Sequence, residues 1–135
     1  MVRKTMFATD KDYREMLRSR KWQRLRAWKI SRHPCCEVCE AEGVAVPAVE
    51  VHHVRPVLSV NGRAAREALM FDPGNIVALC HKCHVEAHRQ LGKWQVRRWD
   101  KKAAEERRRY ELDMFAEKFG LKTGSYDGDR ETGVT

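Results

Sequence analysis

The sequence lacks any long apolar segment. No run of about 18 apolar residues, the length that indicates a membrane-spanning helix, occurs in the chain. The N-terminal stretch MVRKTMFATDKDYR also lacks the apolar core of a secretory signal. The sequence therefore predicts neither a membrane span nor export, and it indicates a cytoplasmic protein.

Internal repeats are absent too, which excludes a repeat array. At 135 residues the chain is predicted to hold one domain. A domain of this size buries a modest core, so an internal cross-link would stabilise it. Its five cysteines are expected to stay reduced without export, which favours metal ligands over disulfides.

Acidic residues are the minority among the charges. Lys and Arg total 27 against 19 Asp and Glu, giving a net charge of +8. This excess indicates a polyanionic partner, most commonly nucleic acid, although a solvated basic face is the alternative. Between Arg14 and Arg32 the chain is especially basic, and some of these side chains are expected to reach DNA phosphates. Trp22, Leu25 and Trp28 in the same segment are expected to lie in the core.

The local patterns predict mostly helices with two short strands. One or two helices are expected between Asp10 and Arg32, with Ser19 as an N-cap and His33-Pro34 as the end. The valines of VPAVEVHHV predict a strand, and NIVAL predicts a second one. The remaining expectations are a short helix in AAREALM, a turn over 71–75, helices over 84–92 and 94–119, and a disordered tail.

Two Cys-x-x-Cys pairs supply four thiolates, the number that a tetrahedral structural zinc ion requires. The pairs are Cys36 with Cys39 and Cys80 with Cys83. Ordinary buried cysteines or one redox pair are the alternatives, and two such pairs in one chain favour zinc. Cys35 is left over and could compete with Cys36 as a ligand, but only Cys36 has the two-residue gap to Cys39. A closed four-sulfur site has no open position for substrate, so its expected role is structural.

The shared zinc site would bring two pairs of histidines together. His84 and His88 are four residues apart, so they lie on one face of a helix. Glu86 does not have the spacing of the metalloprotease motif, which argues against peptide hydrolysis. His52 and His53 are adjacent in a strand and should point to opposite faces. Two different roles, metal ligand and base, suit them better than one; a buried core residue beside an exposed one is the alternative.

Taken together, CEVC, VEVHHVRPV and GNIVALCHKCHVEAH resemble the HNH nuclease family, in particular its small, zinc-containing phage-type branch. The resemblance covers about residues 22–88. It implies an α+β fold with a ββα-metal (His-Me finger) core, stapled by the four-cysteine zinc site and flanked by N-terminal and C-terminal helices. The implied organisation is a basic arm (1–18), the nuclease domain (19–93), a charged helix (94–122) and a disordered tail (123–135).

The resemblance also implies roles for individual residues. His53 would be the general base that activates water, and Asn75 would orient it. The implied ligands of one catalytic divalent ion are His52, His84 and His88, the last of which could instead contact phosphate. Mg²⁺ or Mn²⁺ is favoured, with Zn²⁺ or Ni²⁺ as alternatives. The expected DNA phosphate contacts are Arg20, Arg24 and Arg55.

The function implied is a metal-dependent endonuclease that nicks or cuts double-stranded DNA with low sequence specificity. If the chain is phage-encoded, its expected place is the cytoplasm of a bacterial host, and terminase subunits are expected partners in genome packaging. A non-catalytic, zinc-stapled DNA-binding module is the alternative, and the full set of histidines with Asn75 favours the enzyme. A restriction or homing nuclease is disfavoured, because no additional recognition module is visible.

Overall fold

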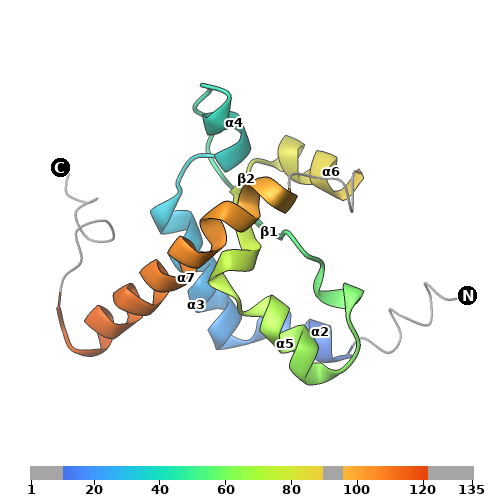
Figure 1. The fold of residues 1–135 in the computed structure, drawn as a ribbon, viewed down its shortest axis with the longest axis vertical. Coiled ribbons are helices and arrows are strands. Elements are labelled where there is room, and N and C mark those ends of the chain that lie inside the picture. Colours follow the sequence, from blue (N-terminus) through green and yellow to red (C-terminus); the bar gives the residue numbers. More distant parts are fainter. Residues whose placement is uncertain (1–10, 90–95, 122–135) are drawn as a thin grey trace, which may run out of the picture.

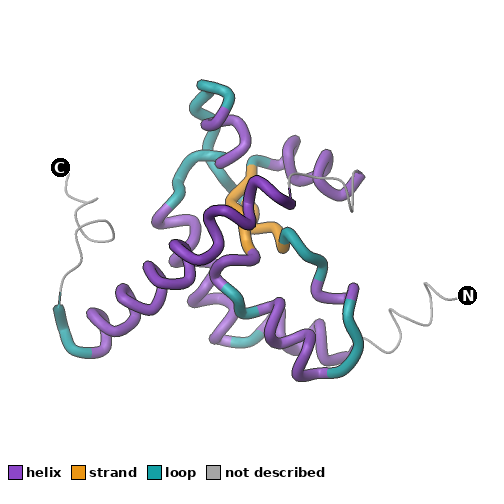
Figure 2. The backbone as a smooth tube through the Cα atoms, in the orientation of Figure 1, coloured by secondary structure: helices purple, strands orange, loops and turns teal. Residues whose placement is uncertain are grey.

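The computed structural model describes residues 11–89 and 96–121. Helices surround a small antiparallel sheet of two strands, β1 (Glu50–His53) and β2 (Ile76–Leu79) (Figure 1). Figure 2 shows these strands at the centre of an otherwise helical chain. The register pairs Glu50 with Leu79 and His53 with Ile76. Every residue of β2 is buried, so this strand lies in the interior. The predicted α+β fold is confirmed.

The first two described helices are α2 (Lys11–Arg18) and α3 (Arg20–Arg32). The chain breaks between them at Ser19, whose hydroxyl accepts a hydrogen bond from the Trp22 backbone N–H at 3.1 Å. This contact satisfies a donor that the first turn of a helix leaves without a partner, as the N-cap prediction required. Trp22, Leu25 and Trp28 are buried together with Met16, as predicted.

A short helix that the sequence did not predict, α4 (Glu37–Ala41), follows α3. Its N-cap is Cys36, whose sulfur accepts a hydrogen bond from the Cys39 backbone N–H. The two-residue gap of the cysteine pair is therefore spanned by the first turn of a helix. Val46 and Val49, expected in the first strand, lie outside β1, in a segment that makes an isolated bridge between Cys35 and Pro47.

The segment between the strands is helical. It contains the 3-10 turn η1 (Val57–Ser59), the predicted helix α5 (Arg63–Met70) and the 3-10 turn η2 (Pro73–Asn75). After β2, helix α6 (His81–Arg89) begins three residues before the expected start at His84. In Figure 1, α4 and α6 lie toward one end of the molecule, and α2 and α5 lie toward the other.

The long C-terminal helix, α7 (Val96–Lys118), runs across η2 (Figure 1). The approach is close at Gly74, where an added Cβ would lie 2.7 Å from the Ala103 carbonyl oxygen. No helix in the described ranges is long and apolar enough to cross a membrane. The predicted tail and most of the predicted N-terminal arm fall outside the described residues, and the predicted domain boundaries stay predictions.

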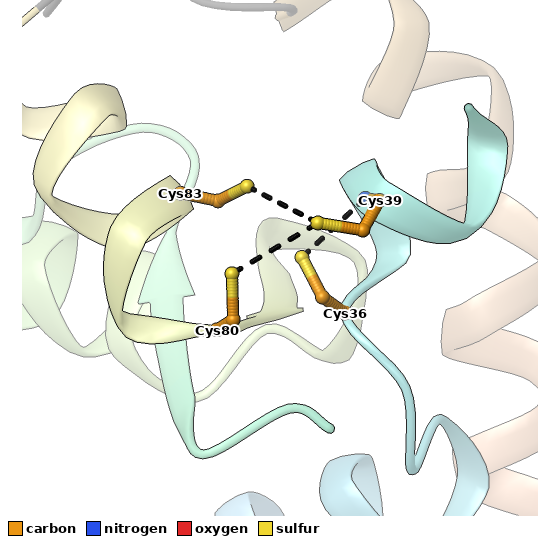
Figure 3. Close-up of side chains that lie close together, drawn as sticks. All are labelled: Cys36, Cys39, Cys80 and Cys83. Atoms are coloured by element: carbon orange, nitrogen blue, oxygen red, sulfur yellow. Dashed lines mark hydrogen bonds between the residues drawn. The ribbon is translucent and has the colours of Figure 1, made fainter. Parts of the chain in front are cut away.

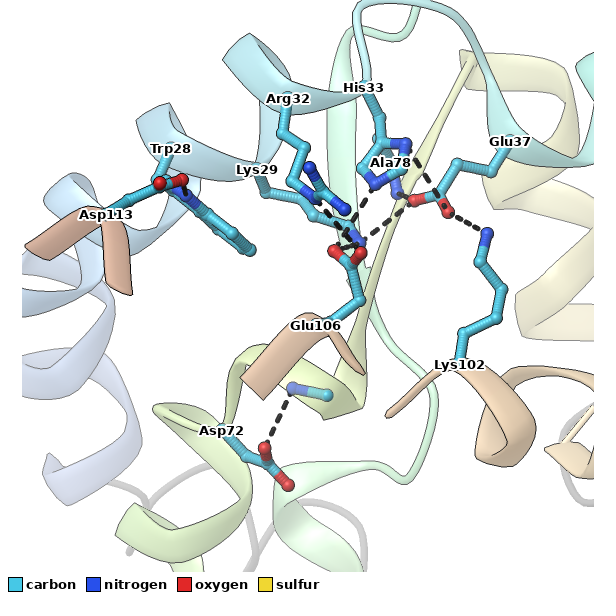
Figure 4. Close-up of polar contacts among 11 residues, drawn as sticks. Trp28, Lys29, Arg32, His33, Glu37, Asp72, Ala78, Lys102, Glu106 and Asp113 are labelled. Carbon is cyan, nitrogen blue, oxygen red and sulfur yellow. Dashed lines mark hydrogen bonds and ion pairs between the residues drawn. The ribbon is translucent and has the colours of Figure 1, made fainter. Parts of the chain in front are cut away.

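A buried network of charges joins α7 to α3 and α4 (Figure 4). The Lys29 ammonium, 1% exposed, lies 3.2 Å from a Glu37 carboxylate oxygen and 2.9 Å from one of Glu106. Arg32, His33 and Lys102 surround the same two carboxylates. Burial acts to raise the pKa of Glu106, but the hydrogen bond with His33 and the Lys29 charge hold this pKa well below its ordinary range. The packing of α7 therefore depends on paired charges inside the molecule.

Candidate metal centres and active-site pocket

Four cysteine side chains converge between α4 and the start of α6 (Figure 3). Their sulfurs all lie within 4.8 Å of one another. The Cys39 sulfur is 3.7 Å from that of Cys83 and 4.0 Å from that of Cys80. Cys36 completes the cluster, and Cys35 is not part of it. The cluster has the ligand count and the spacing to hold a metal ion.

These thiols do not ionise equally. Burial raises the pKa of Cys39 to about 11 and that of Cys83 further. Burial also acts to raise the pKa of Cys36, but hydrogen bonds from the Cys39 and Cys80 backbone hold it below the ordinary value of 9.0. Four thiolates side by side repel one another, so a cation at the centre would be needed to ionise all of them.

Three histidines form a second cluster that could hold a metal ion. His52 of β1 and His84 and His88 of α6 place ring nitrogens within 4.8 Å of one another. The His84 and His88 Nε2 atoms are 3.0 Å apart. Burial lowers the pKa of His52 to about 3, and burial followed by the neighbouring His84 charge lowers that of His88. These two rings are therefore neutral at neutral pH, the form in which imidazole binds metals.

Glu50 is a member of this site that the sequence analysis missed. One of its oxygens contacts the His84 Nδ1, and the other lies 3.1 Å from the Nδ1 of His81. The hydrogen bond from His81 is the main reason that the Glu50 pKa is lowered. A carboxylate on Nδ1 leaves the His84 Nε2 as the ring nitrogen that faces the cluster. Strand alternation was the available signal, because Glu50 lies two residues before His52 and so on the same face.

His53 has different surroundings from its neighbour His52. Its ring stacks on Trp22 with centroids 4.8 Å apart, and its Nε2 lies 3.1 Å from the Met70 carbonyl oxygen. A carbonyl can only accept, so Nε2 carries the hydrogen and Nδ1 carries the lone pair. Burial lowers the pKa of His53 to about 4, although the Met70 contact acts to raise it. The ring is therefore neutral at neutral pH and able to accept a proton at Nδ1.

Asn75 connects the segments that surround His53. Its side-chain oxygen accepts from the Arg55 backbone N–H at 2.8 Å, and its amide nitrogen donates to the Arg55 and Leu69 carbonyls. Its own backbone carbonyl accepts from Val54 at 2.8 Å. The residue is buried, so these bonds are not exposed to competition from water. Asn75 thereby holds the end of β1 against the end of α5, where the Met70 carbonyl lies.

The histidines share one pocket of about 450 Å³. His52, His53, His84 and His88 line it together with Glu50. The apolar part of the wall comprises Tyr13, Leu17, Trp22, Val51, Pro56, Val57 and Leu58. The three arginines predicted to contact phosphate, Arg20, Arg24 and Arg55, are not among the lining residues. Arg24 instead pairs with Glu117 at 2.9 Å.

Comparisons with known proteins find one family and one solved structure that are similar to this chain. Residues 36–90 match the family model described as HNH endonuclease. The fold is similar to the crystal structure of deep-sea thermophilic bacteriophage GVE2 HNH endonuclease with manganese ion, with a TM-score of 0.51 and 26% sequence identity. The similarity covers 67% of this chain and 97% of that one. No curated protein matches the chain.

Proposed function

We propose that the protein is a metal-dependent endonuclease that hydrolyses DNA phosphodiester bonds, on the basis that residues 36–90 match the family model described as HNH endonuclease and that the fold is similar to a phage HNH endonuclease. The observation that carries the proposal is the position of His53. Its Nε2 is occupied by the Met70 carbonyl, and it lines the same pocket as the three-histidine cluster. One substrate in this pocket would thus meet both a base, which accepts a proton, and the metal ligands.

The catalytic ion would be held by His52, His84 and His88. Once bound, a divalent ion supplies positive charge for the phosphate oxygens and the departing 3′ oxygen. Three imidazole nitrogens suit Mn²⁺ better than Mg²⁺, which prefers oxygen ligands. The similar phage enzyme was crystallised with manganese. We therefore favour Mn²⁺ over Mg²⁺ for this site.

The four-cysteine cluster would hold a structural zinc ion. In a tetrahedral site with zinc–sulfur bonds of about 2.3 Å, neighbouring sulfurs are about 3.8 Å apart. The distances of 3.7 and 4.0 Å from Cys39 support that assignment. The ion would join α4 to the start of α6 and so fix the helix that carries His84 and His88.

The proposed reaction uses His53 as the base. A water molecule loses its proton to the His53 Nδ1 while its oxygen bonds to phosphorus. The bond from phosphorus to the 3′ oxygen breaks, and this oxygen then takes a proton from solvent. The products are a 5′ phosphate and a 3′ hydroxyl. The Met70 carbonyl keeps the neutral ring in the required tautomer before the proton transfer, because it accepts from Nε2.

Nicking of supercoiled plasmid tests the proposal. Wild-type protein with Mn²⁺ or Mg²⁺ should convert the plasmid to its relaxed form, and His53→Ala should abolish most of this activity. Glu67→Gln is the control, because the Glu67 side chain is 44% exposed, pairs with Arg63 and lies outside the pocket. Zinc content and circular dichroism should be the same in all three proteins.

The alternative outcome is also informative. If folded wild-type protein binds DNA and leaves the plasmid intact with every divalent ion, the non-catalytic binding module replaces the enzyme. The low sequence specificity and the terminase partner stay predictions from the family resemblance. Cleavage of plasmids of unrelated sequence checks the first. Cleavage with and without terminase subunits checks the second.

A further inference from the structure

Arg26 is the basic side chain in the wall of the active-site pocket. It lies in the middle of α3, outside the segment that matches the family model, and it is half-buried. Among the described residues it is the sole arginine or lysine that lines the pocket. We propose that Arg26 binds the phosphodiester that is cleaved. This assignment rests on the proposed function. It gives a specific role to one residue of the basic segment between Arg14 and Arg32, which the sequence analysis expected only in general to reach phosphates.

The Arg26 guanidinium is held at the edge of the sheet. One of its terminal nitrogens, Nη2, donates to the Val49 carbonyl at 3.1 Å. Val49 immediately precedes Glu50, which contacts His84 of the metal cluster. The guanidinium is therefore anchored beside the residues that would hold the catalytic ion. Because a guanidinium has five N–H groups in a rigid plane, one anchoring bond leaves a fork suited to phosphate oxygens.

The surroundings favour an anionic ligand. Much of the pocket wall is apolar, with Tyr13, Leu17 and Trp22 contributed by α2 and α3. A positive charge beside an apolar wall interacts more strongly with an anion than it would in open water, because the local dielectric is lower. Attack on the phosphate increases the negative charge on its oxygens, and a fixed donor close to them stabilises that charge. Arg26, on α3, would therefore stabilise the phosphate together with the metal ion that histidines of β1 and α6 would hold.

A structural role for Arg26 is the competing explanation, since the bond to Val49 also joins α3 to the segment before β1. Two substitutions separate the roles. Arg26→Gln retains a donor for the Val49 carbonyl and removes the charge. Arg26→Lys retains the charge and loses the planar fork. Arg63→Ala is the control, because it removes one positive charge from α5 at a residue that pairs with Asp12 and Glu67 outside the pocket.

The experiment measures single-turnover cleavage of a labelled duplex at saturating protein. Arg26→Gln should lower the cleavage rate constant on the order of 100-fold, the usual effect of losing one donor to a developing anion. Arg26→Lys should recover part of that loss, and Arg63→Ala should stay within about 2-fold of wild type. Urea unfolding and zinc content should be unchanged in Arg26→Gln. If Arg26→Gln cleaves as well as wild type, or loses activity only in proportion to lost folded protein, the assignment is wrong.

A measurement of DNA binding distinguishes failure of the Arg26 assignment from failure of the proposed function. Affinity is measured in a His53→Ala background so that the duplex stays intact. Adding Arg26→Gln should weaken binding and reduce the salt dependence by about one phosphate contact. Wild-type protein that never cleaves would contradict the proposed function. In that case unchanged binding and an unchanged salt slope in the Arg26→Gln variant would refute the phosphate contact, and a reduced slope would support it.

Discussion

Replacing Lys29 by methionine tests the buried charge network. Methionine has a similar length and no charge, so the substitution removes the ammonium while keeping most of the packing. The ammonium, 1% exposed, lies within 3.2 Å of both Glu37 and Glu106. Removing one partner of a buried pair costs about 3–5 kcal/mol, because the other charge is left in the interior. Arg32 and Lys102 still contact the two carboxylates, so we expect about 3 kcal/mol, the lower end of that range.

Urea unfolding at neutral pH with a fixed zinc concentration measures this loss. Arg24→Ala is the control, because it breaks an ion pair whose side chains are 54% and 51% exposed. Such a pair contributes at most about 1 kcal/mol. A loss below about 1 kcal/mol in Lys29→Met would refute the role assigned to the network.

The same variant has a pH signature. In the folded wild type the pKa values of Glu37 and Glu106 lie below the ordinary 4.5, because the positive charges around them outweigh the effect of burial. Their ion pairs therefore stabilise the fold above pH 4.5, and this contribution is lost as the pH falls through the folded pKa. Lys29→Met removes one of the charges that lower these two pKa values. The difference in unfolding free energy between the variant and wild type should be largest at neutral pH and should shrink on acidification.

Three further substitutions test the packing and the two metal sites. Gly74→Ala places a Cβ 2.7 Å from the Ala103 carbonyl, so α7 must shift and stability should fall by about 1–3 kcal/mol in thermal unfolding; an unchanged melting temperature would show that α7 does not press on η2. Cys39→Ser should lose the metal of the four-cysteine cluster, whereas Cys35→Ser should keep one equivalent by mass spectrometry, and metal loss from the latter would exclude the assigned ligand set. Glu50→Gln should weaken Mn²⁺ binding to the histidine cluster by about 10–100-fold in calorimetry. Glu86→Gln, which removes the charge of Glu86 from an exposed pair with Arg89, should not weaken it. Equal affinities in the two variants would mean that Glu50 does not orient His84.

The parts of the site that the sequence predicted depend on short spacings. Ser19 caps α3 because its hydroxyl reaches the N–H three residues ahead. His84 and His88 share a helix face because they are four residues apart. Strand alternation predicts that His52 and His53 have different surroundings. His52 lies beside His84 in the histidine cluster, and His53 stacks on Trp22. In each case a few neighbouring residues and one regular geometry are enough.

Other features could not be predicted in this way. Lys29 and Glu106 are 77 residues apart, and nothing in the chain near either one indicates the other. A charge-rich helix such as α7 has the composition of a solvated surface helix, yet it places Glu106 in the interior. Arg26 lies in a run of arginines that look alike in sequence, and only its place in the pocket wall distinguishes it from Arg24.

The sequence by itself therefore predicted the cysteines and histidines that the structure brings into two clusters, the candidate base and the two short strands beside them. Those features follow from residue type and from spacings that regular backbone geometry converts into shared faces. Only the tertiary structure decided that Glu50 meets His84, that Arg26 faces the histidines and that α7 closes over Gly74. Such contacts join residues far apart in the chain, and they are set by how the helices pack around the two strands.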